Sequence, residues 1–123
     1  MTKKKMRILH VEDEADTSKI VKTILEKEGF AVVSVDNGKD ALIEIDQDGY
    51  NLLLLDIMMP DMSGWDLFTR ISKLHKENNV IFLTVLKIPN ERLQHLKKFG
   101  VKDYITKPFD RKDFVKRVKK ALE

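Results

Sequence analysis

The most constraining feature of the sequence is an uninterrupted apolar run near its middle that ends at a carboxylate. The run consists of the four leucines from Leu52 to Leu55, and Asp56 follows it directly. Because apolar and polar residues do not alternate, a strand formed by this run must be buried on both faces, as central strands of parallel sheets are. We therefore expect a central parallel strand with Asp56 at its carboxyl end.

Four further apolar segments have the character of strands, and segments of helical periodicity separate them. We expect strands at residues 8–11, 31–35, 52–55, 80–83 and, as a short one, 104–105. Between and after them, apolar residues recur at helical spacing: Ile20, Val21, Ile24 and Leu25; Ala41, Leu42 and Ile45; Leu67, Phe68, Ile71 and Leu74; Leu93 and Leu96; and Phe114, Val115, Val118, Ala121 and Leu122. Strands that alternate with helices predict an α/β fold with a doubly wound parallel sheet of five strands.

Length and composition exclude several classes of protein. The chain has 123 residues, of which 42% are hydrophobic and 35% charged, so residues 1–123 are expected to form one domain. Cysteine is absent and none of the three histidines stands in a metal-binding pattern, which argues against disulfides, zinc sites and catalytic histidines. Neither a nucleotide-binding glycine motif nor a P-loop occurs. No segment is typical of a membrane span or a secretory signal, so we expect a cytoplasmic protein without a membrane partner.

Positive charge is concentrated towards the ends of the chain. The formal net charge is +3, and residues 111–123 contain Arg111, Lys112, Lys116, Arg117, Lys119 and Lys120. The solvated face of a terminal helix explains this cluster better than a nucleic-acid site, because no aromatic residues are interleaved with the basic ones. We expect no direct binding of nucleic acid, whereas an acidic partner is compatible with this helix.

Polar residues stand where four of the expected strands end. Glu12, Asp13 and Glu14 follow the first strand, Asp56 follows the third, Thr84 ends the fourth, and Thr106, Lys107 and Pro108 follow the fifth. Ligands of open α/β sheets bind beyond the carboxyl ends of the strands, so these side chains should meet at one edge. Two carboxylates ~5 Å apart repel each other by about 3 kcal/mol at an effective dielectric constant of ~20. A hard divalent cation relieves that repulsion, and oxygen ligands favour Mg²⁺.

A metal, a lysine, a hydroxyl and a carboxylate free to attack are together typical of a phosphoryl-transfer site. Four motifs carry these groups: Glu12-Asp13, the run from Leu52 through Asp56 and Pro60 to Gly64, the strand-ending Thr84, and Tyr104-Ile105-Thr106-Lys107-Pro108-Phe109. In this order and spacing they resemble the receiver domain of two-component response regulators over nearly the whole chain. The resemblance implies a flavodoxin-like (βα)5 fold with strand order 2-1-3-4-5.

The resemblance also implies a phosphoacceptor and a metal site. Asp56 would accept a phosphoryl group from a phosphohistidine and form an aspartyl phosphate. Mg²⁺ would be the cofactor, with Asp13 as a direct ligand and Glu12 bound through water. Asp56 and the backbone carbonyl of Met58 would complete the protein ligands.

Further residues take roles from the same resemblance. Lys107 would pair with the phosphoryl oxygens, and the Lys107–Pro108 peptide bond would be cis. Thr84 would hydrogen-bond a phosphoryl oxygen, and Tyr104 would turn inward as the aromatic switch residue. Val85 departs from the family pattern, in which a small residue follows the threonine, so its β-branched side chain should narrow access to Asp56 and slow phosphotransfer.

The implied function is a signalling switch in a phosphorelay, not an enzyme that turns over an external substrate. A sensor histidine kinase or a histidine phosphotransfer protein would phosphorylate Asp56. The surface formed by the fourth helix, fifth strand and fifth helix would then change for an unknown downstream protein. Homodimerisation stays open, as does whether the receiver is stand-alone or part of a longer regulator.

Two alternatives to the phosphoacceptor switch are weighed against it. A degenerate receiver would serve as an interaction module independent of phosphorylation, but it would lack the acceptor, the acidic pair or the lysine, and none is missing. A Mg²⁺-dependent phosphatase or nuclease of another α/β family would carry a D-x-D pattern at the key strand. This chain has Asp56-Ile57-Met58 there, which disfavours that alternative.

Overall fold

Five parallel strands form the centre of the computed structural model, which describes residues 4–47, 49–74 and 79–123. They are β1 (Arg7–Val11), β2 (Ala31–Val35), β3 (Leu52–Leu55), β4 (Val80–Thr84) and β5 (Val101–Thr106). Their order in the sheet is β2-β1-β3-β4-β5, and all neighbouring pairs are parallel. The predicted fold class and strand order are therefore confirmed.

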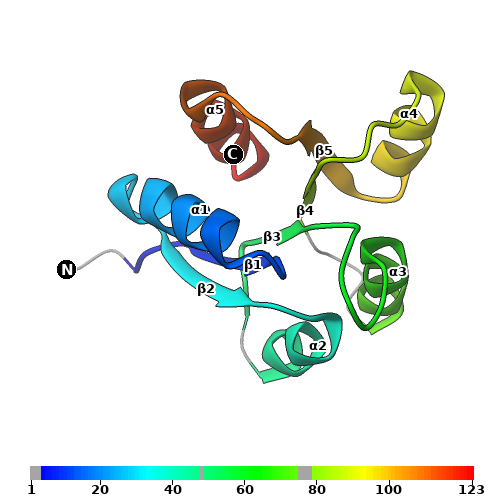
Figure 1. The fold of residues 1–123 in the computed structure, drawn as a ribbon, viewed down its shortest axis with the longest axis horizontal. Helices are drawn as coiled ribbons and strands as arrows, with labels where there is room; N and C mark the ends of the chain where they lie inside the picture. Colours follow the sequence, from blue (N-terminus) through cyan, green and yellow to red (C-terminus); the bar gives the residue numbers. More distant parts are fainter. Residues whose placement is uncertain (1–3, 48, 75–78) are drawn as a thin grey trace.

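Helices cover both faces of this sheet. They are α1 (Ala15–Lys27), α2 (Gly38–Gln47), α3 (Gly64–Leu74), α4 (Asn90–Lys98) and α5 (Arg111–Ala121). Figure 1 shows α1 and α5 on one face and the other three on the opposite face, and the two buried apolar clusters follow the same division. Within the described residues, no helix combines the length and the apolar character needed to cross a membrane.

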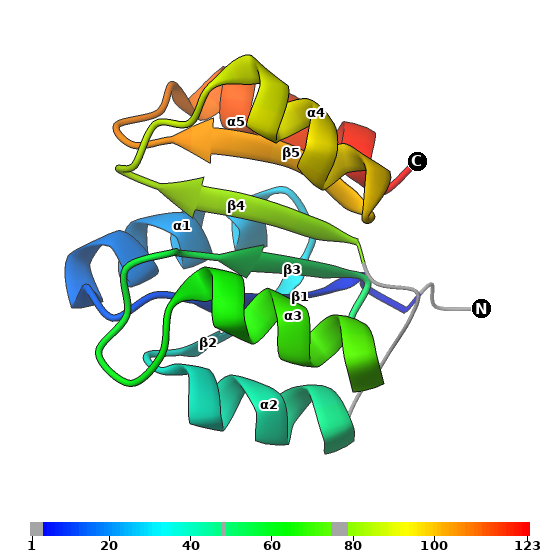
Figure 2. The ribbon, with the colours of Figure 1, turned by 90° about the vertical axis from the view of Figure 1, so that its right-hand side faces the viewer.

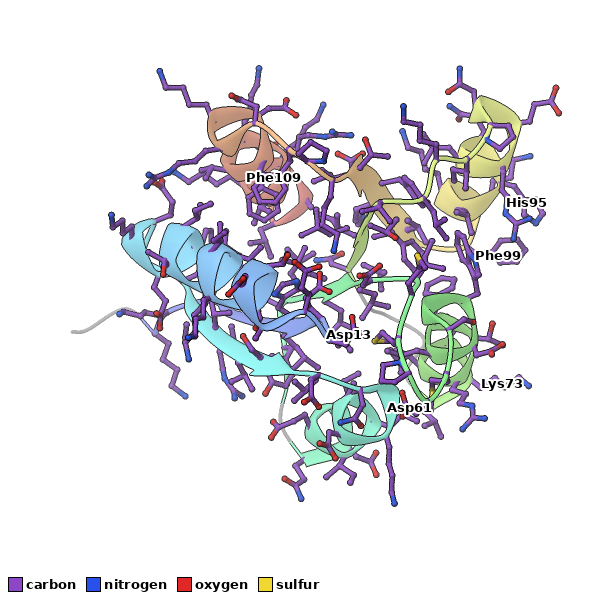
Figure 3. All side chains as sticks on the ribbon, viewed as in Figure 1. Asp13, Asp61, Lys73, His95, Phe99 and Phe109 are labelled. Carbon is purple, nitrogen blue, oxygen red and sulfur yellow. The ribbon has the colours of Figure 1, made fainter. Side chains whose placement is uncertain are left out.

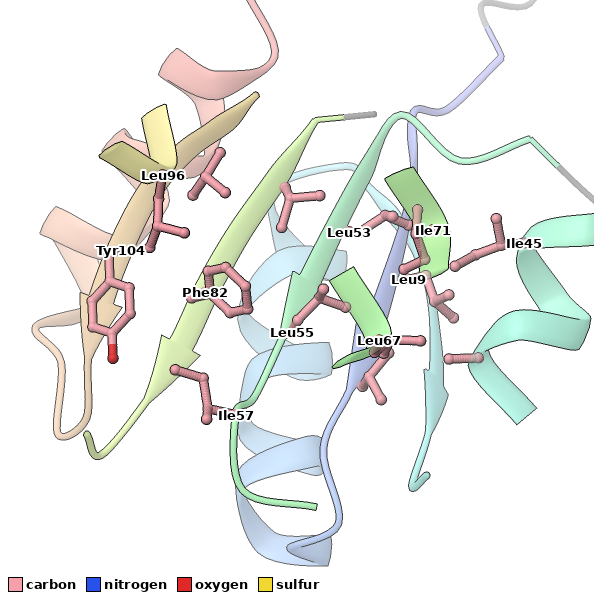
Figure 4. Close-up of a cluster of buried hydrophobic side chains, with 14 residues drawn as sticks. Leu9, Ile45, Leu53, Leu55, Ile57, Leu67, Ile71, Phe82, Leu96 and Tyr104 are labelled. Carbon is pink, nitrogen blue, oxygen red and sulfur yellow. The ribbon is translucent and has the colours of Figure 1, made fainter. Parts of the chain in front are cut away.

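The four leucines of β3 contribute to both apolar clusters. Leu53 and Leu55 face the helices α2, α3 and α4, whereas Leu52 and Leu54 face α1 and α5. Each is at most 2% exposed, and complete burial of a leucine contributes roughly 1.5–3 kcal/mol. Figure 4 shows the first cluster, in which Leu53 and Leu55 lie between β4 and α3. The central buried strand predicted from this run is present, and Asp56 begins the loop that follows it.

The fifth strand is longer than predicted. β5 runs from Val101 to Thr106, so Thr106 belongs to the strand and does not follow it. β5 lies at the edge of the sheet and pairs only with β4. Exposed Lys102 and half-buried Asp103 therefore interrupt its apolar pattern without interrupting the strand.

Two residues of the predicted apolar stripes lie at the surface. Ile20 is 55% exposed and Leu74 is 64% exposed. The buried side of α1 consists of Val21, Ile24 and Leu25, and Ile20 lies at its margin. Leu74 is the last residue of α3, beyond the turns that pack on the sheet.

The carboxyl ends of the five strands meet at one edge of the sheet. Figure 2 shows all arrowheads pointing the same way, with the loops after β3, β4 and β5 gathered beyond them. The C-terminus lies at the opposite edge (Figure 2). This common edge is where the polar residues singled out in the sequence come together.

Candidate functional site

Three charged side chains from three different strand ends meet in a buried ion cluster. The Lys107 ammonium nitrogen Nζ lies 2.5 Å from Glu12 Oε1 and 3.1 Å from Asp56 Oδ2. Glu12 is 2% exposed and Asp56 is 4% exposed, while the Lys107 side chain is 12% exposed. In this buried environment the Lys107 ammonium is the counterion that offsets the repulsion and the desolvation cost of the two carboxylates.

Backbone hydrogen bonds between neighbouring chain segments continue for one residue after the strands end. They hold Glu12, Asp56 and Lys107 in place. The Glu12 amide donates to the Val35 carbonyl at 2.9 Å, and the Asp56 amide donates to the Val11 carbonyl at 3.1 Å. The Lys107 amide donates to the carbonyl of Thr84 at 2.8 Å. The Lys107–Pro108 peptide bond that follows is cis.

The loop after β3, residues 56–63, is held in place by contacts at Gly64, where it ends, and at Asp61 within it. The Gly64 amide donates to the Ile57 carbonyl at 2.9 Å, and the Gly64 Cα lies so close that a Cβ there would collide with the backbone of Asp56 and Ile57. Further along the loop, the Asp61 carboxylate accepts hydrogen bonds from the amides of Gly38 and Lys39, both at 2.9 Å. Figure 3 shows Asp61 beside the start of α2. The loop that carries Asp56 is thus braced by α2 and α3.

Glu12, Asp13 and Asp56 form a group of acidic residues whose oxygen atoms fit a hard cation. One carboxylate oxygen from each lies within 4.8 Å of the others. Asp13 is exposed, so the group opens to solvent on its side (Figure 3). Two ligands of one Mg²⁺ lie up to about 4.2 Å apart, so a small side-chain rotation or a bridging water brings the group to ligand distance. The Met58 amide donates to Asp56 Oδ1 at 3.2 Å, whereas a ligand role for the Met58 carbonyl stays a prediction.

The two buried carboxylates differ in their pKa. Burial raises the pKa of Glu12 to about 7, against the opposing effect of the Lys107 ammonium. Burial also acts to raise the pKa of Asp56, but hydrogen bonds from the Thr84 hydroxyl and the Met58 amide, together with Lys107, outweigh it and lower that pKa. Asp56 is therefore the more acidic of the pair and is ionised at neutral pH.

The segment after β4 is tied to both Thr84 and Tyr104. Thr84 is fully buried, and its hydroxyl accepts a hydrogen bond from the Leu86 amide at 3.4 Å. The Tyr104 hydroxyl donates to the Leu86 carbonyl at 2.7 Å, and Tyr104 is only 7% exposed. Both residues expected to act in switching are thus hydrogen-bonded to the backbone of Leu86.

A cavity of about 480 Å³ opens beside the lysine, between the start of α1 and the loop before α5. Ile20, Val85, Lys107 and Phe109 are among its lining residues. Figure 3 shows Phe109 between α1 and α5, where its ring packs on Phe114 with centroids 4.5 Å apart. Ile20 and Val85 are more than half exposed, so this cavity presents apolar surface next to the ion cluster.

A family model for the response regulator receiver domain matches residues 8–119. This chain belongs to the response regulator receiver family. The resemblance to receiver domains that the sequence motifs indicated is therefore confirmed.

Relatives of this receiver share its sequence and its fold. The uncharacterized transcriptional regulatory protein YkoG of Bacillus subtilis is 36% identical over 118 residues, which are 96% of this chain and 51% of YkoG. The chain spans about half the length of the curated relatives it matches. A CheY-like receiver domain protein from Methanospirillum hungatei superposes with a TM-score of 0.87 at 31% identity, covering 97% of this chain and 94% of that one.

A second solved structure was determined with ligands. It is the response regulator TrrA of Thermotoga maritima in complex with Mg²⁺ and beryllium fluoride. TrrA is 32% identical, with a TM-score of 0.83 and coverage of 95% of this chain and 99% of TrrA.

Sequence reasoning gave no role to two groups that this receiver places near the site. The His10 ring is completely buried below the ion cluster, and neither ring nitrogen has a hydrogen-bond partner within the described part of the chain. Burial and the Lys107 charge lower the pKa of His10 to about 4, so the ring is neutral at pH 7. The Trp65 ring lies under the Arg92 guanidinium, 5.0 Å from the ring centroid. His10 lies within an apolar strand pattern and Trp65 lies outside the expected helical stripe, so periodicity gives neither residue a role at the site.

Proposed function

We propose that this receiver is a phosphoacceptor switch of a two-component phosphorelay, in which a sensor histidine kinase or a histidine phosphotransfer protein phosphorylates Asp56. The observation that carries the proposal is the buried contact of Lys107 with Asp56 and Glu12, with Asp13 at its open side. An ionised carboxylate, a fixed ammonium and an acidic group able to hold a cation are the parts that phosphoryl transfer needs.

In the transfer step, a carboxylate oxygen of Asp56 forms a bond to phosphorus while the bond from phosphorus to the donor histidine nitrogen breaks. The donor leaves as an imidazole, and Asp56 becomes an aspartyl phosphate. Lys107 exchanges its contact with the carboxylate for one with a phosphoryl oxygen, which requires only a small movement from 3.1 Å. Its pKa is raised because Glu12 and Asp56 outweigh the effect of burial, so it stays protonated throughout.

Glu12, Asp13, Asp56 and the backbone carbonyl of Met58 are the proposed ligands of Mg²⁺. The ion, when bound, supplies positive charge that offsets the charge of the phosphoryl oxygens. The complex of TrrA with Mg²⁺ and beryllium fluoride supports the same occupancy here, as does the arrangement of acidic oxygens within 4.8 Å.

The output of phosphorylation is proposed to pass through Leu86. The Thr84 hydroxyl now accepts a hydrogen bond from the Leu86 amide. If the hydroxyl turns to a phosphoryl oxygen, this hydrogen bond breaks. The Leu86 carbonyl is bonded to Tyr104, so the segment before α4 and the side chain of Tyr104 must adjust together. This would change the surface of α4, β5 and α5, which we propose as the contact for a downstream partner.

The receiver is proposed to act as a signalling protein and not as an enzyme with an external substrate. The relatives are named as transcriptional regulatory proteins, which supports transcription control as the output of the protein that carries this receiver. Direct binding of nucleic acid by the receiver is not part of the proposal. A cytoplasmic location stays a prediction, and homodimerisation stays open.

The proposal is tested by intact-protein mass spectrometry after incubation with acetyl phosphate and Mg²⁺. One added phosphoryl mass is expected, and it should disappear with EDTA and in Asp56→Asn. Asp61→Asn is the matched control, because Asp61 is a carboxylate of the same loop that binds α2 instead of the ion cluster. If neither acetyl phosphate nor a panel of histidine kinases phosphorylates Asp56, a receiver-like interaction module becomes the better description.

A further inference from the structure

Besides the cavity near Lys107, a groove of about 560 Å³ lies along the outer side of α5 and the end of α1. Most of its lining comes from one face of α5, whose basic members are Arg111, Lys112, Lys116, Lys119 and Lys120. Figure 1 shows α1 and α5 side by side, and the Lys119 ammonium nitrogen Nζ bridges them by an ion pair of 2.8 Å to Glu28 Oε1. The groove is therefore a property of two packed helices and not of a frayed chain end.

Most of the positive charge in this groove is not neutralised within the molecule. Among the described residues, only Lys119 of these five basic residues forms an ion pair. Arg111, Lys112, Lys116 and Lys120 are all exposed, and no carboxylate of the described residues lies within ion-pair distance of them, although Arg111 acts on Glu28 at longer range. The other basic residue of α5, Arg117, is by contrast turned to the opposite side, where it forms a bidentate pair with Asp103 at 2.7 Å.

The composition of the groove favours an acidic polypeptide over a nucleic acid. Val115 contributes apolar surface between the lysines, and no aromatic ring lines the groove on which a base could stack. Glu28 and Glu123 also line it, so a ligand with negative charge at every position matches the groove less well than one whose negative charge is interrupted. A polypeptide can alternate its carboxylates with apolar or basic residues and so match this pattern.

The groove and the cavity beside the ion cluster are neighbours, because Arg111 lines both. We propose that the α5 groove is a docking surface for an acidic, helical or extended segment of a partner protein. Such a segment would lie along α5 and would place the partner's apolar residues at the cavity near Lys107. The proposal concerns binding alone and holds whether or not Asp56 is phosphorylated.

The test uses an oligo-glutamate peptide of about ten residues interspersed with leucine, which matches α5 in length at ~1.5 Å per helical residue. Binding to the full 123-residue chain is measured by fluorescence anisotropy, and the contacted amides by NMR. The groove variant combines Lys112→Glu, Lys116→Glu and Lys120→Glu. The control variant combines Lys22→Glu, Lys39→Glu and Lys73→Glu, which makes the same change of net charge at exposed positions outside both the groove and the surface of α4, β5 and α5.

We expect saturable binding with amide shifts on α5, and a roughly tenfold or greater loss of affinity in the groove variant relative to the control variant. Equal losses in both variants would show that net charge alone attracts the peptide and would overturn the proposal. Stronger binding of a DNA duplex at the same amides would overturn the choice of a polypeptide. Phosphorylation by acetyl phosphate, measured in both variants, shows that they are folded and separates failure of this proposal from failure of the phosphoacceptor function.

Discussion

The indole ring of Trp65 lies stacked on the phenol ring of Tyr104, with ring centroids 6.4 Å apart and ring planes 18° apart. Both rings also pack near the Phe82 ring of β4, with centroid distances of 4.7 Å for Trp65 and 6.0 Å for Tyr104. Trp65 is the second residue of α3, directly after the loop that carries Asp56, whereas Tyr104 belongs to β5. The aromatic stack therefore connects the loop that carries Asp56 to β5, whose surface is proposed to change.

Binding of a phosphoryl mimic should change the fluorescence of Trp65, the single tryptophan of the chain. The reason is that Tyr104, which is hydrogen-bonded to Leu86 and packs on the indole, is proposed to adjust together with Leu86. Emission is recorded while beryllium fluoride is added in the presence of Mg²⁺. Asp56→Asn should show no response to beryllium fluoride, and an unchanged response in that variant would contradict the connection.

Lys107→Met should destabilise the metal-free protein by about 3 kcal/mol at pH 8, because it leaves two buried carboxylates without their counterion. Mg²⁺ should restore part of this loss by taking the place of the ammonium. Urea unfolding with EDTA or with Mg²⁺ measures both effects. Lys116→Met, at an exposed position, should stay within about 0.5 kcal/mol of the unchanged protein. Equal free energies of unfolding for the two variants would mean that the ion cluster contributes nothing to stability.

Glu12 and His10 should have opposite effects on stability between pH 5 and pH 7 in EDTA. Glu12 has a pKa of about 7 in the folded state against 4.5 ordinarily, so its contribution is full below pH 4.5 and is lost as the pH rises to 7. His10 has a pKa of about 4 against 6.5 ordinarily, so its contribution is full above pH 6.5 and is lost as the pH falls to 4. In the unchanged protein the two largely cancel.

Single substitutions should therefore expose slopes of opposite sign. In Glu12→Gln the free energy of unfolding should rise from pH 5 to pH 7, and in His10→Leu it should fall, each by on the order of 1–3 kcal/mol. Urea titrations at several pH values provide the measurement. Parallel pH profiles for the two variants would rule out this compensation.

Gly64→Ala should cost roughly 1–3 kcal/mol of stability and slow the phosphorylation of Asp56. A Cβ at this position would lie 2.8 Å from the Ile57 Cα and 2.9 Å from the Asp56 carbonyl carbon, so the acceptor loop must shift. Gly49→Ala is the matched control, since a Cβ there meets nothing within 4 Å. Thermal unfolding and acetyl phosphate kinetics report the two effects, and a Gly64→Ala protein that behaves like Gly49→Ala would refute the close approach.

Val85→Ala should accelerate phosphorylation by acetyl phosphate. Val85 lines the cavity beside Lys107, and its removal widens the approach to the ion cluster. Relief of ~1.4 kcal/mol of steric cost would correspond to about a tenfold gain in rate. Single-turnover phosphorylation followed by mass spectrometry gives the rate. An unchanged or lower rate would show that Val85 does not crowd the donor.

The linear pattern of the sequence determined the fold class and placed the candidate site, and its motifs indicated the family. Four leucines in a row form a strand buried on both faces, and the residue that follows such a strand lies at the ligand-binding edge of the sheet. These are local rules that depend on periodicity and on the order of the elements. The same rules failed for β5, where exposed Lys102 hid most of an edge strand.

Only the tertiary structure decided which side chains meet. The Lys107 contact with Glu12 joins residues 95 positions apart, and the stack of Trp65 on Tyr104 joins α3 to β5. The groove beside α5 likewise depends on Glu28 at the end of α1. Such contacts follow from the packing of distant elements at particular distances and angles. Side-chain periodicity within one element shows which face is buried, but it does not specify which partner that face meets.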